Sequence, residues 1–186
     1  MAIRELPYRS LHPLIREHLS DAEDESTAAL IQRFRPARLR GHLTKGEFEE
    51  VCRWKSPRSI GKVRLNTHHR IRKATGAALL ATSELDRIQA LVALQGVSVP
   101  TASAILTMLD PERYGVIDIR VWQLLHRLGV VESNPGGTNL TVAQWERFLA
   151  LIRELASTFG VSARSIERTL FFVHRRYQEG RLYTAR

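Results

Sequence analysis

The chain has 186 residues and 44% hydrophobic content, with 28 lysines and arginines against 19 acidic residues, a formal net charge of +9. This length and apolar content predict a folded domain with its own core and exclude a disordered chain. The positive charge favours nucleic acid over a membrane as partner, and a single cysteine, Cys52, excludes an internal disulfide and a multi-cysteine metal site. The sequence shows neither a leader-like apolar run nor a membrane-spanning segment, so we expect a soluble cytoplasmic protein, associated with the nucleoid if the source is bacterial.

Apolar spacing and capping residues predict four helices in the first half of the chain, over 14–19, from the acidic opening 20–25 to Pro36, from Thr44 to Pro57, and over 66–80. Thr44 and Glu47 have the spacing of a capping box. Proline is expected to end the second and third of these helices.

A span of one-sided charge overlaps these helices. From Val51 to Ser83 the sequence has no acidic residue, whereas it carries eight basic ones: Arg53, Lys55, Arg58, Lys62, Arg64, Arg70, Arg72 and Lys73. A solvated face usually mixes both signs, so this run predicts a surface that faces phosphates. A basic surface without a partner is the alternative.

The stretch 83–129 organises the rest of the chain. Residues 83–94 predict an amphipathic helix with a serine N-cap, and Gly96 breaks it. Pro100 suits the first turn of a second helix, and Asp118 opens a third that ends near Gly129. Two helices joined by a short glycine turn present free backbone N–H groups, which form a site for an anion such as a DNA phosphate.

The last third predicts a loop followed by two helices. Residues 130–139 are dense in Asn, Pro and Gly, Thr141 caps a helix that Gly160 ends, and Ser162 or Ser165 opens the last helix. Convincing strand alternation is absent throughout the sequence. The fold class is therefore predicted as all-α, with roughly eight to ten helices.

The segment Leu94-Gln-Gly-Val-Ser-Val-Pro-Thr-Ala102 resembles the helix-hairpin-helix DNA glycosylase superfamily, which includes endonuclease III-like and adenine mismatch glycosylases. The hairpin of that superfamily reads Leu-Pro-Gly-Val-Gly-x-x-Thr-Ala. Its catalytic aspartate lies eighteen positions after the site that carries lysine in lyase-active members; here that site is Pro100, and the spacing leads to Asp118. Segments 102–106 and 116–121 are also similar, so the resemblance covers about a quarter of the chain.

The resemblance implies one domain over 1–186 with two helical lobes, the hairpin lying in a lobe of roughly 40–130. It also implies a monomer that acts on double-stranded DNA as a monofunctional glycosylase, hydrolysing the N-glycosidic bond of a damaged or mismatched base. Asp118 would stabilise the positive charge that develops on the deoxyribose. A helix cap without catalytic work is the structural alternative for Asp118.

The departures from the superfamily pattern limit the expected chemistry. Pro100 has no amine, which rules out Schiff-base strand cleavage from that site. Ser98 and Gln95 replace a glycine and a proline of the hairpin. Cys52 alone cannot hold an iron–sulfur cluster, so we expect no such cofactor, and a monovalent cation at the hairpin is implied by resemblance only.

The candidate site residues follow from these observations. We expect DNA contacts from the hairpin amides and the basic span, at Gly96, Ser98, Thr101, Lys55, Arg58, Lys62 and Arg64. The amine of Lys55 is also a candidate displaced nucleophile, against phosphate contact or solvent exposure as alternatives. Candidate base-pocket residues are Trp54, Trp122 and Tyr114, with core packing as the alternative for both tryptophans. No metal site is expected.

Two further functions remain open from the sequence. The scaffold would also suit a non-catalytic helix-hairpin-helix DNA-binding protein, and the altered hairpin positions favour that alternative. A regulatory protein whose positive charge serves RNA or an acidic partner is a third interpretation.

Overall fold

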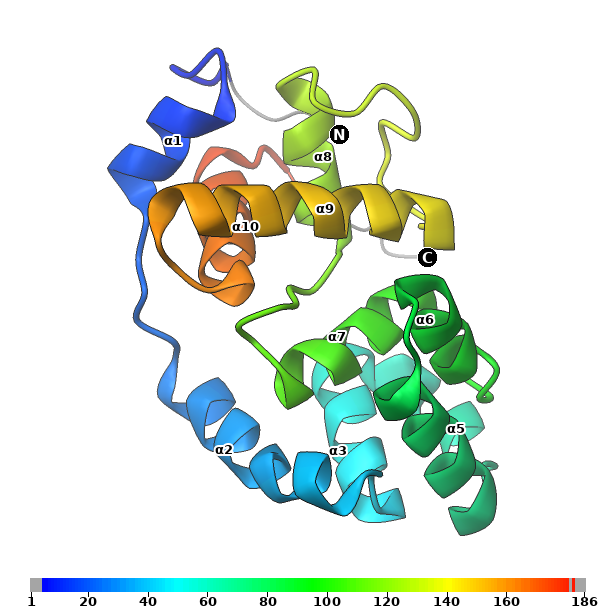
Figure 1. Cartoon of the computed structure of the whole chain (residues 1–186). Coiled ribbons are helices and arrows are strands. Elements are labelled where there is room, and N and C mark those ends of the chain that lie inside the picture. Colours follow the sequence, from blue (N-terminus) through cyan, green and yellow to red (C-terminus); the bar gives the residue numbers. More distant parts are fainter. Residues whose placement is uncertain (1–4, 181, 183–186) are drawn as a thin grey trace.

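The computed structural model describes residues 5–180 and residue 182, and the regular structure of this part of the chain is helical (Figure 1). The elements are α1 (Leu11–His18), α2 (Glu25–Arg40), α3 (Lys45–Lys55), a 3-10 turn (Pro57–Ser59), α4 (Ile60–Val63), α5 (His68–Leu80), α6 (Glu84–Val92), α7 (Val99–Leu109), α8 (Ile119–Arg127), α9 (Val142–Phe159) and α10 (Ala163–Tyr177). The predicted all-α class is confirmed. The first four residues, on which the expected absence of a leader partly depends, lie outside the described residues.

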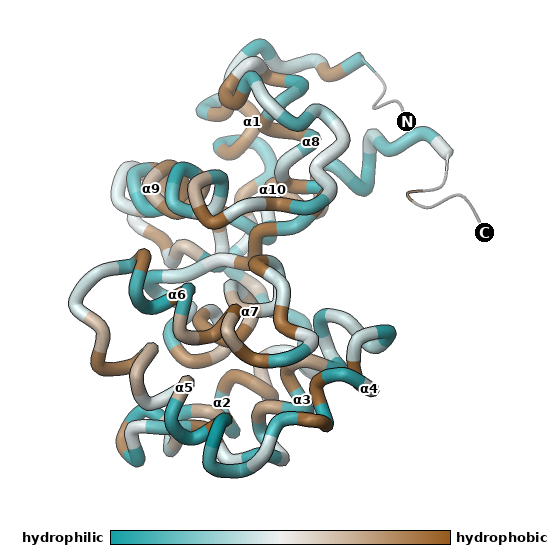
Figure 2. The backbone as a smooth tube through the Cα atoms, turned by 90° about the vertical axis from the view of Figure 1, so that its right-hand side faces the viewer, coloured by the Kyte–Doolittle hydropathy of each residue, from teal (hydrophilic) through white to brown (hydrophobic). Residues whose placement is uncertain are grey.

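The helices pack in two groups. Helices α2 to α7 contact one another in one group, while α1, α8 and α9 surround α10 in the other, and α6 and α7 reach α9 between them (Figure 1). The side view shows the same separation (Figure 2). Every residue of α7 except Pro100 is buried, including its three hydroxyl-bearing residues, so α7 is the central helix of its group.

Local capping chemistry sets many helix ends. The capping box of Thr44 and Glu47 begins α3, Ser83 caps α6, and Thr141 caps α9 within a second capping box, which confirms the three predicted starts. Of the two serines considered for the last helix, Ser162 is the cap. These side chains accept hydrogen bonds from backbone N–H groups that have no partner inside the helix.

The expected end of the second helix was wrong. Pro36 lies inside α2, which continues to Arg40 and ends at Gly41 with φ of 77°. Proline removes one backbone hydrogen bond from a helix interior. Here the last turn is retained because Ala37 is completely buried against the core and Gly41 supplies the left-handed C-cap.

The helices of residues 5–180 have no stretch long and apolar enough to cross a membrane.

Candidate functional site

A cleft of about 660 Å³ lies where the two helix groups meet. The end of α3, the start of α7, the start of α8, the loop before α9 and one side chain of α10 form its walls. Its described lining includes a single acid, Asp118, together with the cations Lys55, Arg58 and Arg120. Ser98, Pro100 and Thr101 of the predicted hairpin also line it, so the cleft joins the hairpin and the aspartate that the sequence analysis singled out.

Asp118 is the N-cap of α8, and its two carboxylate oxygens have different partners. Oδ1 accepts hydrogen bonds from the N–H groups of Arg120 at 2.9 Å and Val121 at 3.1 Å. Oδ2 lies 3.4 Å from Nζ of Lys55. The cap bonds fix the carboxylate in place, and Oδ2 is the oxygen left for the cleft.

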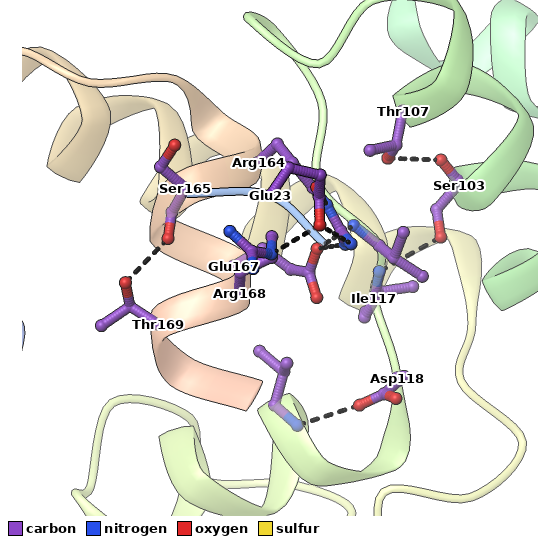
Figure 3. Close-up of polar contacts among 12 residues, drawn as sticks. Glu23, Ser103, Thr107, Ile117, Asp118, Arg164, Ser165, Glu167, Arg168 and Thr169 are labelled. Atoms are coloured by element: carbon purple, nitrogen blue, oxygen red, sulfur yellow. Dashed lines mark hydrogen bonds and ion pairs between the residues drawn. The ribbon is translucent and has the colours of Figure 1, made fainter. Parts of the chain in front are cut away.

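The hydroxyl of Ser103 binds the segment before Asp118 to α7. The hydroxyl of Ser103 accepts the N–H of Ile117 at 3.1 Å and donates to the carbonyl of Pro100 at 2.9 Å. Thr107 in turn donates to the carbonyl of Ser103 (Figure 3). Because one serine binds both the start of α7 and the residue before Asp118, the distance between hairpin and carboxylate is fixed by short-range contacts.

A short turn that contains a left-handed glycine joins α6 to α7. Gly96 has φ of 77°, and the N–H of Val97 donates to the carbonyl of Leu94 at 3.2 Å. Ser98 is the N-cap of α7 yet makes no side-chain capping bond to the backbone; its hydroxyl lies 3.2 Å from that of Thr101 instead. The backbone N–H groups of Val99 and Thr101, on either side of Pro100, therefore receive no side-chain cap.

Asn66 holds this turn from the neighbouring segment. Its side chain is completely buried and bonds the main chain of Gln95 twice, accepting the N–H at 2.9 Å and donating to the carbonyl at 2.9 Å. A third bond goes to the carbonyl of Val63 at 2.8 Å. The sequence predicts Asn66 only as the start of a helix, because its contact with Gln95 spans 29 residues and has no local signature.

A second, inner cavity of about 290 Å³ lies on the α10 side of Asp118. Trp54, Lys55, Asp118 and Phe171 line both cavities and so form the boundary between them. Phe172 and three arginines of α10 contribute to the inner wall. A flat ring of base size would there meet aromatic faces and guanidinium groups.

Glu167 is a buried carboxylate at the wall of the inner cavity. It accepts the N–H of Val116 at 3.2 Å and is paired with the guanidinium of Arg164. Burial raises the pKa of Glu167, and the nearby Asp118 carboxylate raises it further, against the opposing charges of Arg164 and Lys55. The close approach of α10 to this segment requires Gly115, since a Cβ there would lie 2.7 Å from Cβ of Glu167.

Glu23 completes an ion-pair cluster with α10 that the sequence analysis missed. Its carboxylate lies 2.8 Å from Nε of Arg164 and 2.7 Å from Nε of Arg168 (Figure 3). The acidic opening 20–25 predicts only a helix start. The ion pairs of Glu23 with α10 are long-range contacts, and only the excess of acids before α2 could have indicated them.

The predicted DNA-contacting residues are partly brought together. Lys55 and Arg58 line the cleft with Ser98 and Thr101, and Cβ of Lys62 lies 3.0 Å from the position that a Cβ on Gly96 would take. Arg64 is instead held by the carboxylate of Glu49 at 3.6 Å, with most of its side chain exposed.

One alternative for Lys55 was exposure to solvent, and the structure contradicts it. Only 16% of its side chain is accessible, and its amine faces Asp118 across a sequence separation of 63 residues.

The three candidate pocket aromatics have different positions. Trp54 lines both cavities and is 38% exposed, with the guanidinium of Arg164 5.9 Å from its ring. Trp122 is 1% exposed and donates its indole N–H to the carbonyl of Ser133. Tyr114 is 3% exposed and donates to the carboxylate of Glu84. Trp122 and Tyr114 thus pack in the core, the alternative stated for the former, and neither lines the two cavities.

The described part of the chain contains no group of three His, Cys, Asp or Glu side chains that could hold a metal ion. A monovalent cation at the hairpin would need several carbonyl oxygens. Two turn carbonyls already accept hydrogen bonds, that of Leu94 from Val97 and that of Gln95 from Asn66, so a cation here would share these oxygens with those donors.

Comparison with protein-family models, with curated proteins and with solved structures gives no match to this chain.

Proposed function

We propose that the protein is a DNA glycosylase of the helix-hairpin-helix type, which removes a damaged or mismatched base from double-stranded DNA by water attack. The observation that carries the proposal is the position of Asp118 in the same cleft as Ser98 and Thr101 at the start of α7. A phosphate at the α7 amides would hold the strand, while the neighbouring sugar would face Oδ2 of Asp118. The net charge of +9 and the cations of the cleft favour this strand as the occupant.

The chemistry assigned to Asp118 follows from its geometry. Breaking an N-glycosidic bond builds positive charge on the sugar ring, and a carboxylate fixed by two amide hydrogen bonds stabilises that charge without rearranging. The base must leave the helix stack to expose its sugar. The inner cavity, with Trp54 and Phe171 at its mouth, is the proposed receiving pocket.

A non-catalytic DNA-binding protein is the second candidate, and the contacts of Asp118 favour it. A carboxylate that caps α8 and pairs with Lys55 is already engaged as a structural residue would be. On this view the cleft binds a strand, and Asp118 only keeps the α8 end in place.

Base release from a panel of lesion-bearing duplexes separates the two candidates. The duplexes would contain uracil, oxidised guanine, alkylated bases or adenine opposite oxidised guanine, with abasic sites revealed by alkaline cleavage. We expect release from at least one duplex and a loss of about a hundredfold or more in Asp118→Asn, which keeps the cap but removes the charge.

Asp110→Asn is the matched control, because Asp110 pairs with Arg38 outside the cleft and its loss should leave release within about twofold. Release that Asp118→Asn retains would contradict the proposed mechanism. Salt-sensitive binding without release from the whole panel would favour the binding protein.

A further inference from the structure

Lys55 is the last residue of α3 and carries a primary amine into the boundary between the two cavities. Its Nζ lies 3.4 Å from Oδ2 of Asp118, with 16% and 13% of the two side chains accessible. Both residues line the outer cleft and the inner cavity. The amine is therefore placed beside the oxygen that the proposed function directs at the deoxyribose.

The carboxylate next to this amine is rigid. Its other oxygen is held by the N–H groups of Arg120 and Val121, so Asp118 cannot turn away without losing the cap of α8. The separation of 3.4 Å is longer than a strong charge-assisted hydrogen bond. An amine beside a fixed carboxylate is the arrangement for attack on a carbonyl carbon, because the carboxylate can accept the ammonium proton and return it to the departing oxygen.

The carbonyl that would reach this position is the aldehyde of an abasic deoxyribose. Removal of a base leaves C1′ of the sugar as a hemiacetal in equilibrium with its open-chain aldehyde. Pro100, at the hairpin position where an amine would otherwise stand, has none, whereas Lys55 enters the same cleft from α3.

We propose that Lys55 is a nucleophile toward the C1′ aldehyde of an abasic site and gives the protein an abasic-site lyase activity. The ammonium proton passes to Asp118, and Nζ then bonds to C1′ to form a carbinolamine. Its oxygen takes one proton from Nζ and the proton that Asp118 returns, and it leaves as water, so that a protonated imine forms. Asp118 then accepts a proton from C2′. The C3′–O bond breaks, a C2′=C3′ double bond forms, and the 3′ phosphate leaves with its strand.

This inference rests on the proposed function only in that a deoxyribose occupies the cleft beside Asp118. The test therefore uses a duplex with one preformed abasic site, which needs no base release by the protein. Incubation with borohydride reduces the imine to a stable covalent adduct, and tryptic digestion then identifies the attached lysine. An adduct on Lys55 blocks cleavage there and should appear on the peptide 54–58.

We expect a covalent adduct and a cleaved strand with the wild-type protein. The adduct should fall at least about tenfold in both Lys55→Arg and Lys55→Gln. Lys55→Arg retains a cation beside Asp118, so its thermal unfolding and duplex binding show whether the fold is intact. Lys73→Gln is the matched control, because Lys73 is an exposed lysine of α5 that lines a different hollow, and its adduct should stay within about twofold of wild type.

An adduct that maps to other lysines, or that survives Lys55→Arg, would overturn the inference, as would the absence of any adduct. Base release without an adduct at Lys55 would remove this inference and leave the proposed function intact. An adduct at Lys55 without base release from any duplex would support the lyase activity and contradict the glycosylase.

Discussion

The side-chain amide of Asn66 binds the main chain of Gln95 through both its oxygen and its nitrogen, each at 2.9 Å. This pair joins the segment after α4 to the turn that precedes α7. The position of this turn determines where the first amides of α7 lie relative to the cleft. A completely buried asparagine thus supports the candidate phosphate site without lining the cleft itself.

Replacing Asn66 with alanine should destabilise the protein by about 2 to 3 kcal/mol, since two partly buried backbone groups of Gln95 and the carbonyl of Val63 lose their partner. Equilibrium unfolding in urea would measure this change. Gln95→Ala is the control, because it removes an exposed side chain and keeps both main-chain bonds. A loss for Asn66→Ala no larger than that for Gln95→Ala would contradict the assigned role.

Gly96 is the second residue that shapes the same turn. Its φ of 77° is left-handed, and a Cβ there would lie 2.8 Å from the backbone nitrogen of Val63. Gly129 has a similar φ of 69° but open space around it. A substitution at Gly129 therefore measures backbone strain alone, whereas one at Gly96 adds a close contact with Val63.

We expect Gly129→Ala to cost about 1 to 2 kcal/mol through the left-handed conformation alone. Gly96→Ala should cost at least about 1 kcal/mol more and weaken DNA binding, because the Val63 backbone must move. Thermal unfolding and a duplex-binding titration of both variants would test this. Equal losses in the two variants would show that the contact with Val63 has no energetic weight.

Local patterns were sufficient for much of the helical layout. Thr44 with Glu47, Ser83, Asp118 and Thr141 all cap helices as predicted, because a cap depends on residues within one turn. Pro36 was wrong because tertiary burial of the following turn outweighed the lost backbone bond. The all-α class was likewise accessible from periodicity.

The surroundings of Asp118 could be predicted from the sequence only in part. Its cap position follows from local sequence, whereas the approach of Lys55 spans 63 residues. The buried pair of Glu167 and Arg164 depends on how α10 packs against the segment before α8. Glu167 looks like any helical surface acid in the sequence, since its contact with Val116 spans 51 residues and has no local signature.

The basic surface next to the hairpin should contribute to DNA affinity through phosphate contacts. Lys62 is exposed and lies beside Gly96, whereas Lys73 is an exposed lysine of α5 that lines a different hollow with Arg40. Lys62→Ala should lower the slope of log affinity against log salt by about one unit. Fluorescence anisotropy with a short duplex at several salt concentrations measures that slope.

Lys73→Ala makes the same change in net charge and should leave the slope near the wild-type value. If the two variants reduce the slope equally, the contribution is one of overall charge and not of contacts at the hairpin.

The two roles of Asp118 can be separated by side-chain chemistry. Asp118→Ala removes the cap and should cost about 1 kcal/mol of stability, while Asp118→Asn keeps the bonds to the amides of α8 and should cost less. Both should lose base release. Urea unfolding alongside the release assay compares them, and a catalytic loss that followed stability across the pair would indicate a structural role only.

His174 makes the stability of the fold dependent on pH. It is completely buried, its Nε2 lies 3.0 Å from the side-chain oxygen of Gln123, and its Nδ1 has no hydrogen-bond partner among the described residues. Burial, with the charge of Arg120 added and Asp118 opposing, lowers the pKa of His174 from 6.5 to about 4. The neutral ring is therefore the form that the fold accommodates.

The unfolded chain takes up a proton at His174 below about pH 6.5, while the folded protein does so only near pH 4. Stability should consequently fall as the pH is lowered through this window, by up to about 3 kcal/mol at about 1.4 kcal/mol per pKa unit, and be unaffected by this group above pH 7. Urea unfolding of wild type and His174→Gln from pH 7 to pH 4 would measure the difference. Because glutamine does not titrate, the variant should lose less stability over this range, and parallel curves would show that His174 is protonated equally in both states.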